Sequence, residues 1–321
     1  MKYRIGVDLG GTKMFVSLAN GDGEIFRSQR VPTKALQGPS IVLNHLKSIV
    51  NEIIAQDGIS LKDVEGLGVC IAGFFDIRSK RIVSSPNLPG WELFPLEDEL
   101  TAQYDLPVIV ENDANAAAYG EYVFGAGKDK NNMIFITLGT GIGGGIITDG
   151  KLLRGSRGFA GEIGHMIVLP QGPPCGCGKF GCLESFSSGS AIEREGRMLL
   201  QEGRSSILSG LAGPGSVLSA SHVFAAAREG DKEALKIVER AAYFLGLALS
   251  FTVNLLNPDV IVMGGGMAHS GEIFFNPVRR CLEEAAIAPA AKMVSLVPSC
   301  LGDEAGVKGV LALLDDHLQG K

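Results

Sequence analysis

Apolar runs and glycine turns alternate along the chain in an order that occurs twice. An apolar segment at 3–7 leads through a glycine turn at 8–13 into a second apolar segment at 14–19, followed by an Asn-Gly-Asp-Gly turn. Residues 132–153 repeat this order about 130 positions later. Short β-branched runs bounded by Gly and Asp predict strands, and self-similarity at such a distance predicts two related halves.

The remaining apolar positions alternate between helical and extended spacing. Helical spacing predicts helices at 40–56, with Ser40 as N-cap, and at 114–125, 190–203, 219–231, 231–257, 275–286 and 305–318. Apolar runs predict further strands at 64–73, 107–110, 259–263 and 292–300. Alternating strands and helices are typical of α/β layers, so the predicted fold class is α/β. Segment 203–216 is expected to be a loop that could be mobile.

One uncharged stretch is long enough to be considered as a membrane span. Residues 241–258 carry no charge over 18 positions, the lower limit for crossing a bilayer. They include Asn254, Asn257 and Pro258 and lead directly into another apolar strand. We therefore expect a buried helix and no membrane association.

Length and composition describe an ordinary globular protein. The chain has 321 residues, enough for two domains. Hydrophobic residues make up 45% and charged residues 20%, which excludes a disordered or fibrous chain. The 44 glycines are about twice the usual share of roughly 7%. Many stand in tight groups, where backbone approaches another group closely.

Charge and the amino terminus indicate the kind of partner and compartment. The net charge is −6, the pI is near 5.5 and no basic run occurs, so a nucleic-acid surface is not expected. Small molecules are the expected partners. The first residues lack the apolar core of a signal peptide, so a cytoplasmic location with reduced cysteines is expected.

The glycine loops do not fit two common nucleotide motifs. Gly139, Gly141 and Gly144 satisfy G-x-G-x-x-G, but a strand and a hairpin turn follow where a dinucleotide site needs a helix. The Gly-Gly-Thr-Lys at 10–13 lacks the residue order of a P-loop. What remains is a pair of glycine hairpins whose N–H groups could bind phosphate oxygens.

Three cysteines and one histidine have metal-ligand spacing. His165, Cys175, Cys177 and Cys182 form the pattern H-x9-C-x-C-x4-C, which matches a closed Cys3His zinc site. Four protein ligands leave no position for water, so the zinc would be structural. The alternatives are buried reduced cysteines or, less favoured in a reducing compartment, a disulfide.

Two glutamates flank the outermost ligands of this motif. A metal would bring Glu162 and Glu184 into one place, where their oxygens and a ring nitrogen of His165 could bind sugar hydroxyls. Without the metal, each glutamate would more simply be a solvated charge or a helix-start residue.

Asp113 stands where a strand ends and a helix begins. It could be an N-cap, or a general base at the carboxyl edge of a sheet that takes a proton from a sugar hydroxyl. Spacing leaves both possibilities open.

The first glycine hairpin could hold ATP phosphates. Its N–H groups and the Thr12 hydroxyl would face the phosphates, with Asp8 near a Mg2+ ion, while Lys13 could be only a surface residue. The triplet Gly264–Gly266 suits the nucleoside side, although turns use glycine as freely.

Read in order, six motifs resemble the ROK family of bacterial sugar kinases and repressors, within the actin-like ATPase superfamily. They are DLGGTK, ENDANAAA, LGTGIGGG, GEIGHM, CGCGKFGCLE and PDVIVMGGG, and the resemblance covers residues 5 to about 310. The segment SSPNLPGW at 84–91 is most similar to the glucokinase members. One departure is Ala72, where many relatives have proline before Gly73.

The resemblance implies roles for individual residues. Asp113 would be the catalytic base. Sugar contacts would come from Gly73, Asn87, Asn112, Asp113, Glu162, His165 and Glu184. Zinc would bind His165, Cys175, Cys177 and Cys182. Nucleotide contacts would come from Asp8, Gly10, Gly11, Thr12, Lys13, Thr140, Gly141, Gly143, Gly265 and Gly266.

It also implies a two-domain actin-like ATPase fold, related to ribonuclease H, with an interdomain cleft and a zinc loop. The small domain would contain 1–113 and 302–321, and the large domain 114–301. A homodimer or homotetramer is expected. The implied activity is an ATP- and Mg2+-dependent hexose kinase of glycolysis, most similar to a glucokinase.

Other functions stay open. N-acetylmannosamine or N-acetylglucosamine could replace glucose. A repressor would carry a DNA-binding domain before the first strand, which is expected to begin by residue 3. An actin-like ATPase that binds no sugar would have no use for glutamates linked to a zinc site.

Overall fold

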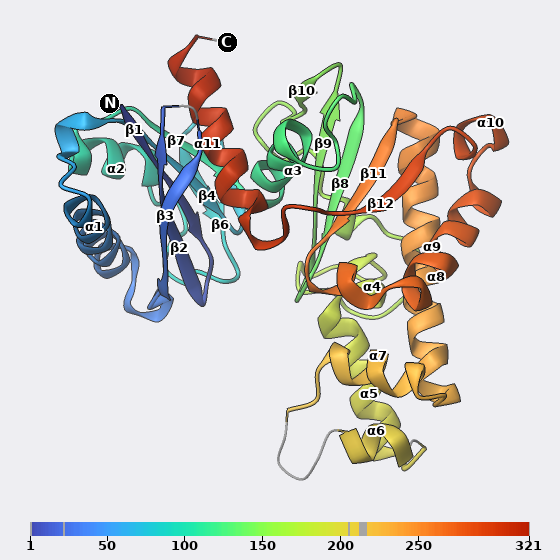
Figure 1. Ribbon diagram of the computed structural model, residues 1–321. Helices are drawn as coiled ribbons and strands as arrows, with labels where there is room; N and C mark the ends of the chain where they lie inside the picture. The colour runs from blue at the N-terminus through green and yellow to red at the C-terminus, as the bar shows by residue number, and fades with distance from the viewer. Residues whose placement is uncertain (1, 22, 205, 212–216, 321) are drawn as a thin grey trace. The chain divides into compact units, whose positions relative to one another are not determined.

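The computed structural model describes residues 2–21, 23–204, 206–211 and 217–320 (Figure 1). Its contacts divide the chain into two units. The first unit contains Met1–Asp129, Gly145–Gly161 and Cys300–Lys321, and the second contains Lys130–Gly144 and Glu162–Ser299. Two five-stranded sheets with covering helices confirm the α/β class.

The two sheets order their strands in the same way. The first is β3-β2-β1-β4-β7 and the second is β10-β9-β8-β11-β12, which confirms the predicted repeat. The strands of the first are β1 (Tyr3–Leu9), β2 (Lys13–Asn20), β3 (Ile25–Pro32), β4 (Val64–Ile71) and β7 (Val108–Asn112). The strands of the second are β8 (Met133–Leu138), β9 (Ile142–Thr148), β10 (Lys151–Leu152), β11 (Val260–Gly264) and β12 (Ser295–Pro298). A separate hairpin pairs β5 (Phe74–Asp76) with β6 (Arg81–Ser84).

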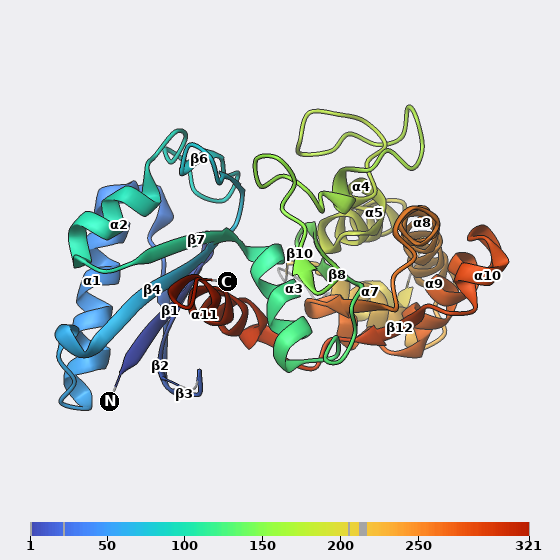
Figure 2. The same ribbon diagram turned by 90° about the horizontal axis from the view of Figure 1, so that it is seen from above.

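Helices cover both faces of the first sheet. Figure 2 shows α1 (Pro39–Gln56) and α2 (Leu96–Tyr104) on one face and α11 (Ala305–Leu318) on the other. The predicted N-cap of α1 is wrong: Gly38 takes that place and Pro39 is the first helical residue, a position proline favours.

Glycines let α11 lie close to the first sheet. A Cβ atom at Gly6 of β1 would lie 2.8 Å from the side chains of Val307 and Leu311, and one at Gly68 of β4 would lie 2.9 Å from the Val310 carbonyl oxygen. Contacts this short exclude any side chain. The same α11 packs against α3 (Asp113–Phe124), which is why α3 belongs to the first unit.

The second unit is built around α8 (Lys232–Leu256), the predicted long helix. The Asp231 carboxylate caps its start by accepting the N–H groups of Glu233 and Ala234, each at 3.0 Å. Asn257 ends it in the left-handed region at φ 44°. Among the described residues, no helix is both long enough and apolar enough to span a bilayer.

Shorter helices surround α8 and connect the strands. They are α4 (Glu184–Ser187), α5 (Gly189–Gln201), α6 (Ser206–Leu211), α7 (Ala220–Arg228), α9 (Glu272–Ala285) and α10 (Ala288–Ala291). Single 3-10 turns occur at η1 (Ala35–Gln37), η2 (Leu61–Asp63), η3 (Ile163–His165), η4 (Gly266–Ser270) and η5 (Gly302–Glu304).

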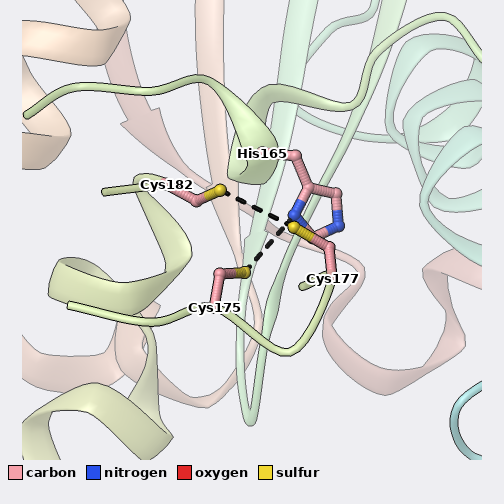
Figure 3. Close-up of side chains that lie close together, drawn as sticks. All are labelled: His165, Cys175, Cys177 and Cys182. Atoms are coloured by element: carbon pink, nitrogen blue, oxygen red, sulfur yellow. Dashed lines mark hydrogen bonds between the residues drawn. The ribbon is translucent and has the colours of Figure 1, made fainter. Parts of the chain in front are cut away.

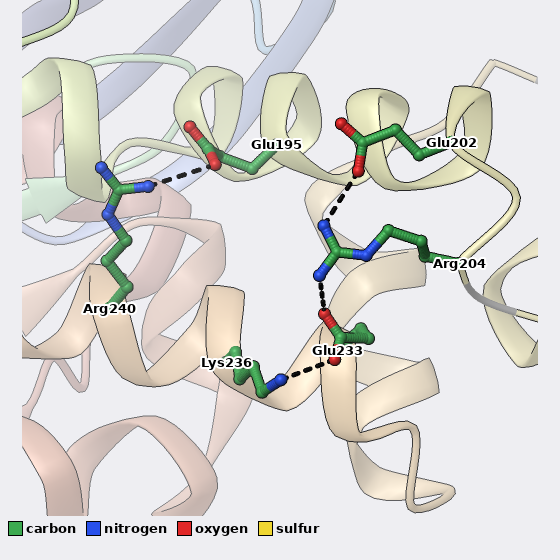
Figure 4. Close-up of polar contacts among 6 residues, drawn as sticks. All are labelled: Glu195, Glu202, Arg204, Glu233, Lys236 and Arg240. Carbon is green, nitrogen blue, oxygen red and sulfur yellow. Dashed lines mark hydrogen bonds and ion pairs between the residues drawn. The ribbon is translucent and has the colours of Figure 1, made fainter.

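The expected loop at 203–216 is partly wrong, because α6 occupies its centre, where Leu208 is buried in the core of the unit. Residues 205 and 212–216 of that segment lie outside the described residues. Ion pairs join its beginning to α8: Arg204 contacts Glu202 and Glu233 (Figure 4). These side chains are partly exposed, so each pair adds little stability.

The crossing of α3 and α11 provides a stability test. A Cβ at Gly120 of α3 would lie 2.3 Å from the Ala305 carbonyl oxygen and 3.1 Å from the Gly309 nitrogen. We expect Gly120→Ala to destabilise the protein by about 1–3 kcal/mol, as overpacking does. Circular dichroism during heating should show an earlier first transition.

The matched control is Gly210→Ala in α6, where no atom of the described residues outside the local helix backbone lies within 4 Å of the added methyl group. It should be neutral or stabilise by up to about 1 kcal/mol. A Gly120→Ala variant that melts with the wild type would contradict the packing argument.

Candidate active site and metal centre

Three polar residues lie side by side at the ends of neighbouring strands in the first unit. The register pairs Asp8 of β1 with Cys70 of β4, and Cys70 with Glu111 of β7. A Cβ at Gly306, at the start of α11, would lie 3.3 Å from Cys70 Sγ and 3.6 Å from Asp8 Oδ2. This row therefore faces α11 at the carboxyl ends of parallel strands, where α/β sheets bind ligands.

Asp113 is the first residue of α3, directly after β7. The N-cap interpretation of Asp113 is wrong, because Asn112 is the N-cap: its Oδ1 accepts the N–H of Asn115 at 3.0 Å. Burial raises the pKa of Asp113 to about 7, and the negative charge of Asp8 adds to this shift. A carboxylate with a pKa near neutrality is suited to accept a proton at pH 7.

A buried thiol stands beside these carboxylates. Burial raises the pKa of Cys70 well above its usual value, and the charges of Asp8 and Asp113 raise it further. The thiol is therefore neutral and donates a hydrogen bond to Asp8. Burial also raises the pKa of Asp8, while this hydrogen bond opposes that shift.

The first glycine turn lies against the loop of Asn87. The N–H of Gly10 donates to the Lys13 carbonyl oxygen at 3.1 Å, which closes the turn between β1 and β2. A Cβ at Gly11 would lie 2.5 Å from the Asn87 carbonyl oxygen, so only glycine fits there. The side chains of Thr12, Lys13 and Asn87 are exposed.

Gly73 is held against Asn112 by the backbone. Its φ of +129° and the 2.6 Å between an added Cβ and the Ser84 carbonyl oxygen both require glycine. Its carbonyl oxygen accepts the Asn112 Nδ2 group at 3.0 Å. Next to it, the rings of Phe74 and Phe159 meet edge to face with centroids 5.9 Å apart.

The predicted zinc ligands converge in the second unit (Figure 3). The candidate ligand atoms of His165, Cys175, Cys177 and Cys182 lie within 4.8 Å of one another. The Cys175 Sγ to His165 Nδ1 distance and the Cys177 Sγ to Cys182 Sγ distance are both 3.7 Å. Tetrahedral bonds of about 2.3 Å give ligand separations of about 3.8 Å, so these residues fit a zinc ion.

The two predicted glutamates lie beside this cluster. Glu184 begins α4, and its Oε2 accepts the Ile142 N–H at 2.9 Å while its Oε1 lies 3.4 Å from Cys175 Sγ. Glu162 Oε2 lies 3.9 Å from His165 Nε2, the ring nitrogen that does not face the thiols. Both carboxylates and the imidazole are only partly buried, so the cluster presents three polar groups together.

A cavity of about 380 Å³ opens next to the second glycine loop. Its lining includes Thr140 and Gly266, both predicted nucleotide contacts, together with Ser219, Arg228 and His269. This volume is in the range of small-molecule sites.

The other predicted glycines in this unit differ in their surroundings. A Cβ at Gly265 would lie 2.5 Å from the Leu138 carbonyl oxygen, and its φ is +80°. A Cβ at Gly141 would lie 2.5 Å from Glu184 Oε2. Gly143 lies inside β9, and none of these three glycines lines the cavity.

The predicted residues form two sets, one in each unit. The first set is Asp8, Gly10, Gly11, Thr12, Lys13, Gly73, Asn87, Asn112 and Asp113. The second is Thr140, Gly141, Gly143, Glu162, His165, Cys175, Cys177, Cys182, Glu184, Gly265 and Gly266.

Three groups that lie close to these predicted residues were not predicted as site residues from the sequence. Cys70 shows no motif, and only the strand register places it beside Asp8. Arg228 reaches the cavity from α7, where its Nη2 donates to the Ser270 carbonyl oxygen at 2.7 Å. An Ala-Ala-Ala-Arg segment gives no sign of such a position. Glu111 was part of a quoted motif, but its partner Arg154 is 43 residues away.

The protein is a mixed α/β protein with the actin-like ATPase fold. Its two sheets have the same strand order, and glycine hairpins and carboxylates lie at the ends of their strands. The model of the ROK family matches residues 4–317. The chain belongs to the ROK family.

Individual relatives include enzymes and a regulator. A glucokinase from Halalkalibacterium halodurans is 38% identical over 309 residues, covering 96% of this chain and 93% of the relative. The chain is also similar to the crystal structure of a ROK family glucokinase from Streptomyces griseus in complex with glucose and AMPPNP, with 35% sequence identity and a TM-score of 0.82. The match covers 97% of this chain and 98% of that chain. The xylose repressor of Bacillus subtilis is 30% identical, and the match covers 98% of this chain but 77% of the repressor.

Proposed function

We propose that this protein is an ATP-dependent glucokinase that phosphorylates the 6-hydroxyl of glucose. The observation that carries the proposal is the position of Asp113, a partly buried carboxylate directly after β7 whose pKa is raised to about 7. Full-length similarity to glucokinases supports glucose as the substrate. Phosphoryl transfer to an alcohol needs a base that can accept the proton of the attacking hydroxyl, and little other covalent chemistry from the protein.

In the proposed reaction Asp113 accepts the proton of the 6-hydroxyl as that oxygen bonds to the γ-phosphorus and the bond to the leaving ADP oxygen breaks. Sugar hydroxyls are assigned to Gly73, Asn87, Asn112, Asp113, Glu162, His165 and Glu184. The amide and carboxylate groups among them can accept or donate hydrogen bonds, and such polar sites reject sugars that lack a hydroxyl.

The nucleotide is assigned to the two glycine loops and the cavity of the second unit. Backbone N–H groups of Gly10, Gly11 and Thr12 would bind phosphate oxygens, and Thr140 and Gly266 would lie near the nucleoside. Asp8 would hold Mg2+, which when bound supplies positive charge against the phosphates. The partly buried Asp8 carboxylate, at the carboxyl end of β1, offers oxygen ligands of the kind a hard cation prefers.

Zinc at His165, Cys175, Cys177 and Cys182 is assigned a structural role. The four ligands complete its coordination. Its proposed effect on catalysis is indirect: it fixes the segment that carries Glu184 and the ring of His165.

Two other functions have some support. The N-acetylhexosamines share the sugar hydroxyls that the assigned groups would bind, so they belong in any substrate test. A regulatory role is suggested by the similarity to the xylose repressor, but a protein that only binds sugar would not need the general base proposed at Asp113.

We further propose a role in glycolysis in the cytoplasm, a homodimer or homotetramer, and a division into domains of 1–113 with 302–321 and of 114–301. The contact units differ from this division by assigning 114–129, 145–161 and 300–301 to the first unit. Exposed apolar side chains on α8, namely Tyr243, Phe251 and Leu255, support assembly with a second copy.

The function is tested with the purified protein, ATP and Mg2+, and a panel of glucose, mannose, fructose, N-acetylmannosamine, N-acetylglucosamine and no sugar. A coupled assay measures ADP release. We expect glucose to give the highest kcat/KM and the sample without sugar to give almost none. Equal ADP release with and without sugar would indicate an ATPase, and a preference for an N-acetylhexosamine would replace glucose as the substrate.

Asp113→Asn tests the general base. The amide keeps the size of the side chain but cannot accept the proton, so we expect kcat to fall by about 10²–10⁴-fold, with glucose binding retained in calorimetry. In the wild type, kcat/KM should fall as the pH is lowered through about 7, because protonation removes the base. Near-normal turnover of the variant would exclude this role.

Cys177→Ala tests the zinc assignment. We expect mass spectrometry of the dialysed wild type to find one zinc per chain and the variant to lose it. Glucose affinity should weaken more than ATP affinity, since Glu184 and His165 lose their anchor. Cys300→Ala, an exposed thiol outside the cluster, is the control and should keep the metal. Unchanged glucose affinity in a zinc-free variant would contradict the organising role.

A further inference from the structure

Glu111 is a buried carboxylate two residues before the proposed base. It is the penultimate residue of β7 and only 3% exposed. An ionised carboxylate at such a position is costly unless it is hydrogen-bonded and paired with a positive charge. Its partners therefore indicate what it is for.

One oxygen of Glu111 holds both sides of the turn between β7 and α3. Oε1 accepts the backbone N–H of Asn112 at 3.0 Å and the side-chain Nδ2 of Asn115 at 3.1 Å. Asn112 Oδ1 in turn accepts the N–H of Asn115 at 3.0 Å. Asp113 lies inside this closed set of hydrogen bonds, so its backbone direction is fixed by groups on either side.

The other oxygen of Glu111 pairs with an arginine from a distant segment. Arg154, in the loop after β10, donates its Nε to Glu111 Oε2 at 2.6 Å. A charge-assisted hydrogen bond of this length is among the stronger ones in proteins. The Arg154 side chain is 36% exposed, in contrast to the 5% of Glu111, so it can be changed with less disturbance of the core.

We propose that Glu111 and Arg154 are positioning residues for Asp113: the pair fixes the β7–α3 turn so that the base meets the reacting hydroxyl. This inference rests on the proposed role of Asp113. Neither residue is assigned to the sugar or the nucleotide, so the pair acts on turnover through the geometry of the base. A displacement of about 1 Å from the reacting atoms can cost about 10²-fold in rate.

The experiment compares Arg154→Met, Arg154→Lys and Glu111→Gln with the wild type on glucose. Steady-state kinetics gives kcat and KM, and calorimetry gives the glucose Kd. Arg154→Met keeps the length of the side chain without its charge, so we expect kcat to fall by about 10- to 100-fold and Kd to change by less than about threefold. Arg154→Lys restores a donor and should recover kcat to within about fivefold of the wild type.

Glu111→Gln should lower kcat at least as much as Arg154→Met does, because the amide has no charge and only one oxygen to accept the bonds of both Arg154 and the turn. Should this variant fail to fold, the two arginine variants decide the question alone. The proposal would be overturned if Arg154→Met kept the kcat of the wild type. It would also be overturned if Arg154→Lys had a kcat as low as that of Arg154→Met.

Glu121→Gln is the matched control. Glu121 lies further along α3, is 0% exposed and accepts the N–H groups of Ala126 at 2.8 Å and Leu301 at 2.9 Å. It should lower the melting temperature but leave kcat within about twofold of the wild type. Equal losses of kcat in Glu121→Gln and Arg154→Met would mean that both act through stability alone, which would overturn the proposal.

Failure of this inference is distinct from failure of the function. A wild type that does not phosphorylate any sugar overturns the proposed function. Suppose instead that the wild type is active, that Asp113→Asn loses this activity and that Arg154→Met keeps it. That result overturns only the positioning role.

Discussion

The partly buried position of Asp8 and Asp113, at the carboxyl ends of β1 and β7, is the constraint on which the rest of the first unit depends. Burial raises the pKa of both carboxyl groups, and the charge of Asp8 raises that of Asp113 further. A raised carboxyl pKa means that the folded protein binds the proton more tightly than the unfolded chain. The stability that this group contributes is therefore present at low pH and is lost as the pH rises toward about 7. A carboxyl group that titrates near neutrality is therefore obtained at a cost in folding free energy.

Close backbone packing around these carboxylates offsets that cost. Glycines on β1 and β4 bring α11 against the sheet, and Gly120 and Gly309 bring α3 against α11. With this backbone fixed, Cys70 supplies a neutral donor to Asp8. A neutral thiol stabilises the Asp8 carboxylate without adding a charge beside Asp113, and the charge of Arg30 lowers the pKa of Asp8 further. The proton affinity of Asp113 can then stay near neutrality.

The sequence predicted those parts of the molecule whose signal is local. The apolar spacing of α8, with Asp231 before it and Asn257 after it, marks a helix at both ends. The cysteine spacing placed four ligand atoms together because a short glycine-rich loop has few ways to fold around them. Helix α2 was missed, since only Leu96, Leu100 and Tyr104 are buried and its first turn is acidic.

Features that depend on distant partners could not be predicted. Asn112 and Asp113 are both good N-caps, and the choice between them follows from the end of β7. The partner of Glu111 comes from a loop 43 residues away, and no pattern in one chain connects the two. Similarly, the Phe74–Phe159 contact depends on how the β5–β6 hairpin meets that loop.

In the second unit, the proposed zinc and the sugar-binding role proposed for Glu184 would be connected through the two oxygens of this carboxylate. Oε2 is held by the Ile142 N–H, whereas Oε1 faces the Cys175 thiol. Cys175 as a metal ligand is a thiolate and no longer a donor. Oε1 would then have no hydrogen-bond donor from Cys175, and a sugar hydroxyl could donate to it instead. Because Oε2 still fixes the side chain, up to about 2 kcal/mol of rotamer entropy is already lost before the sugar binds. Loading with zinc would thus turn Glu184 from a partner of the protein into a preorganised acceptor for the substrate.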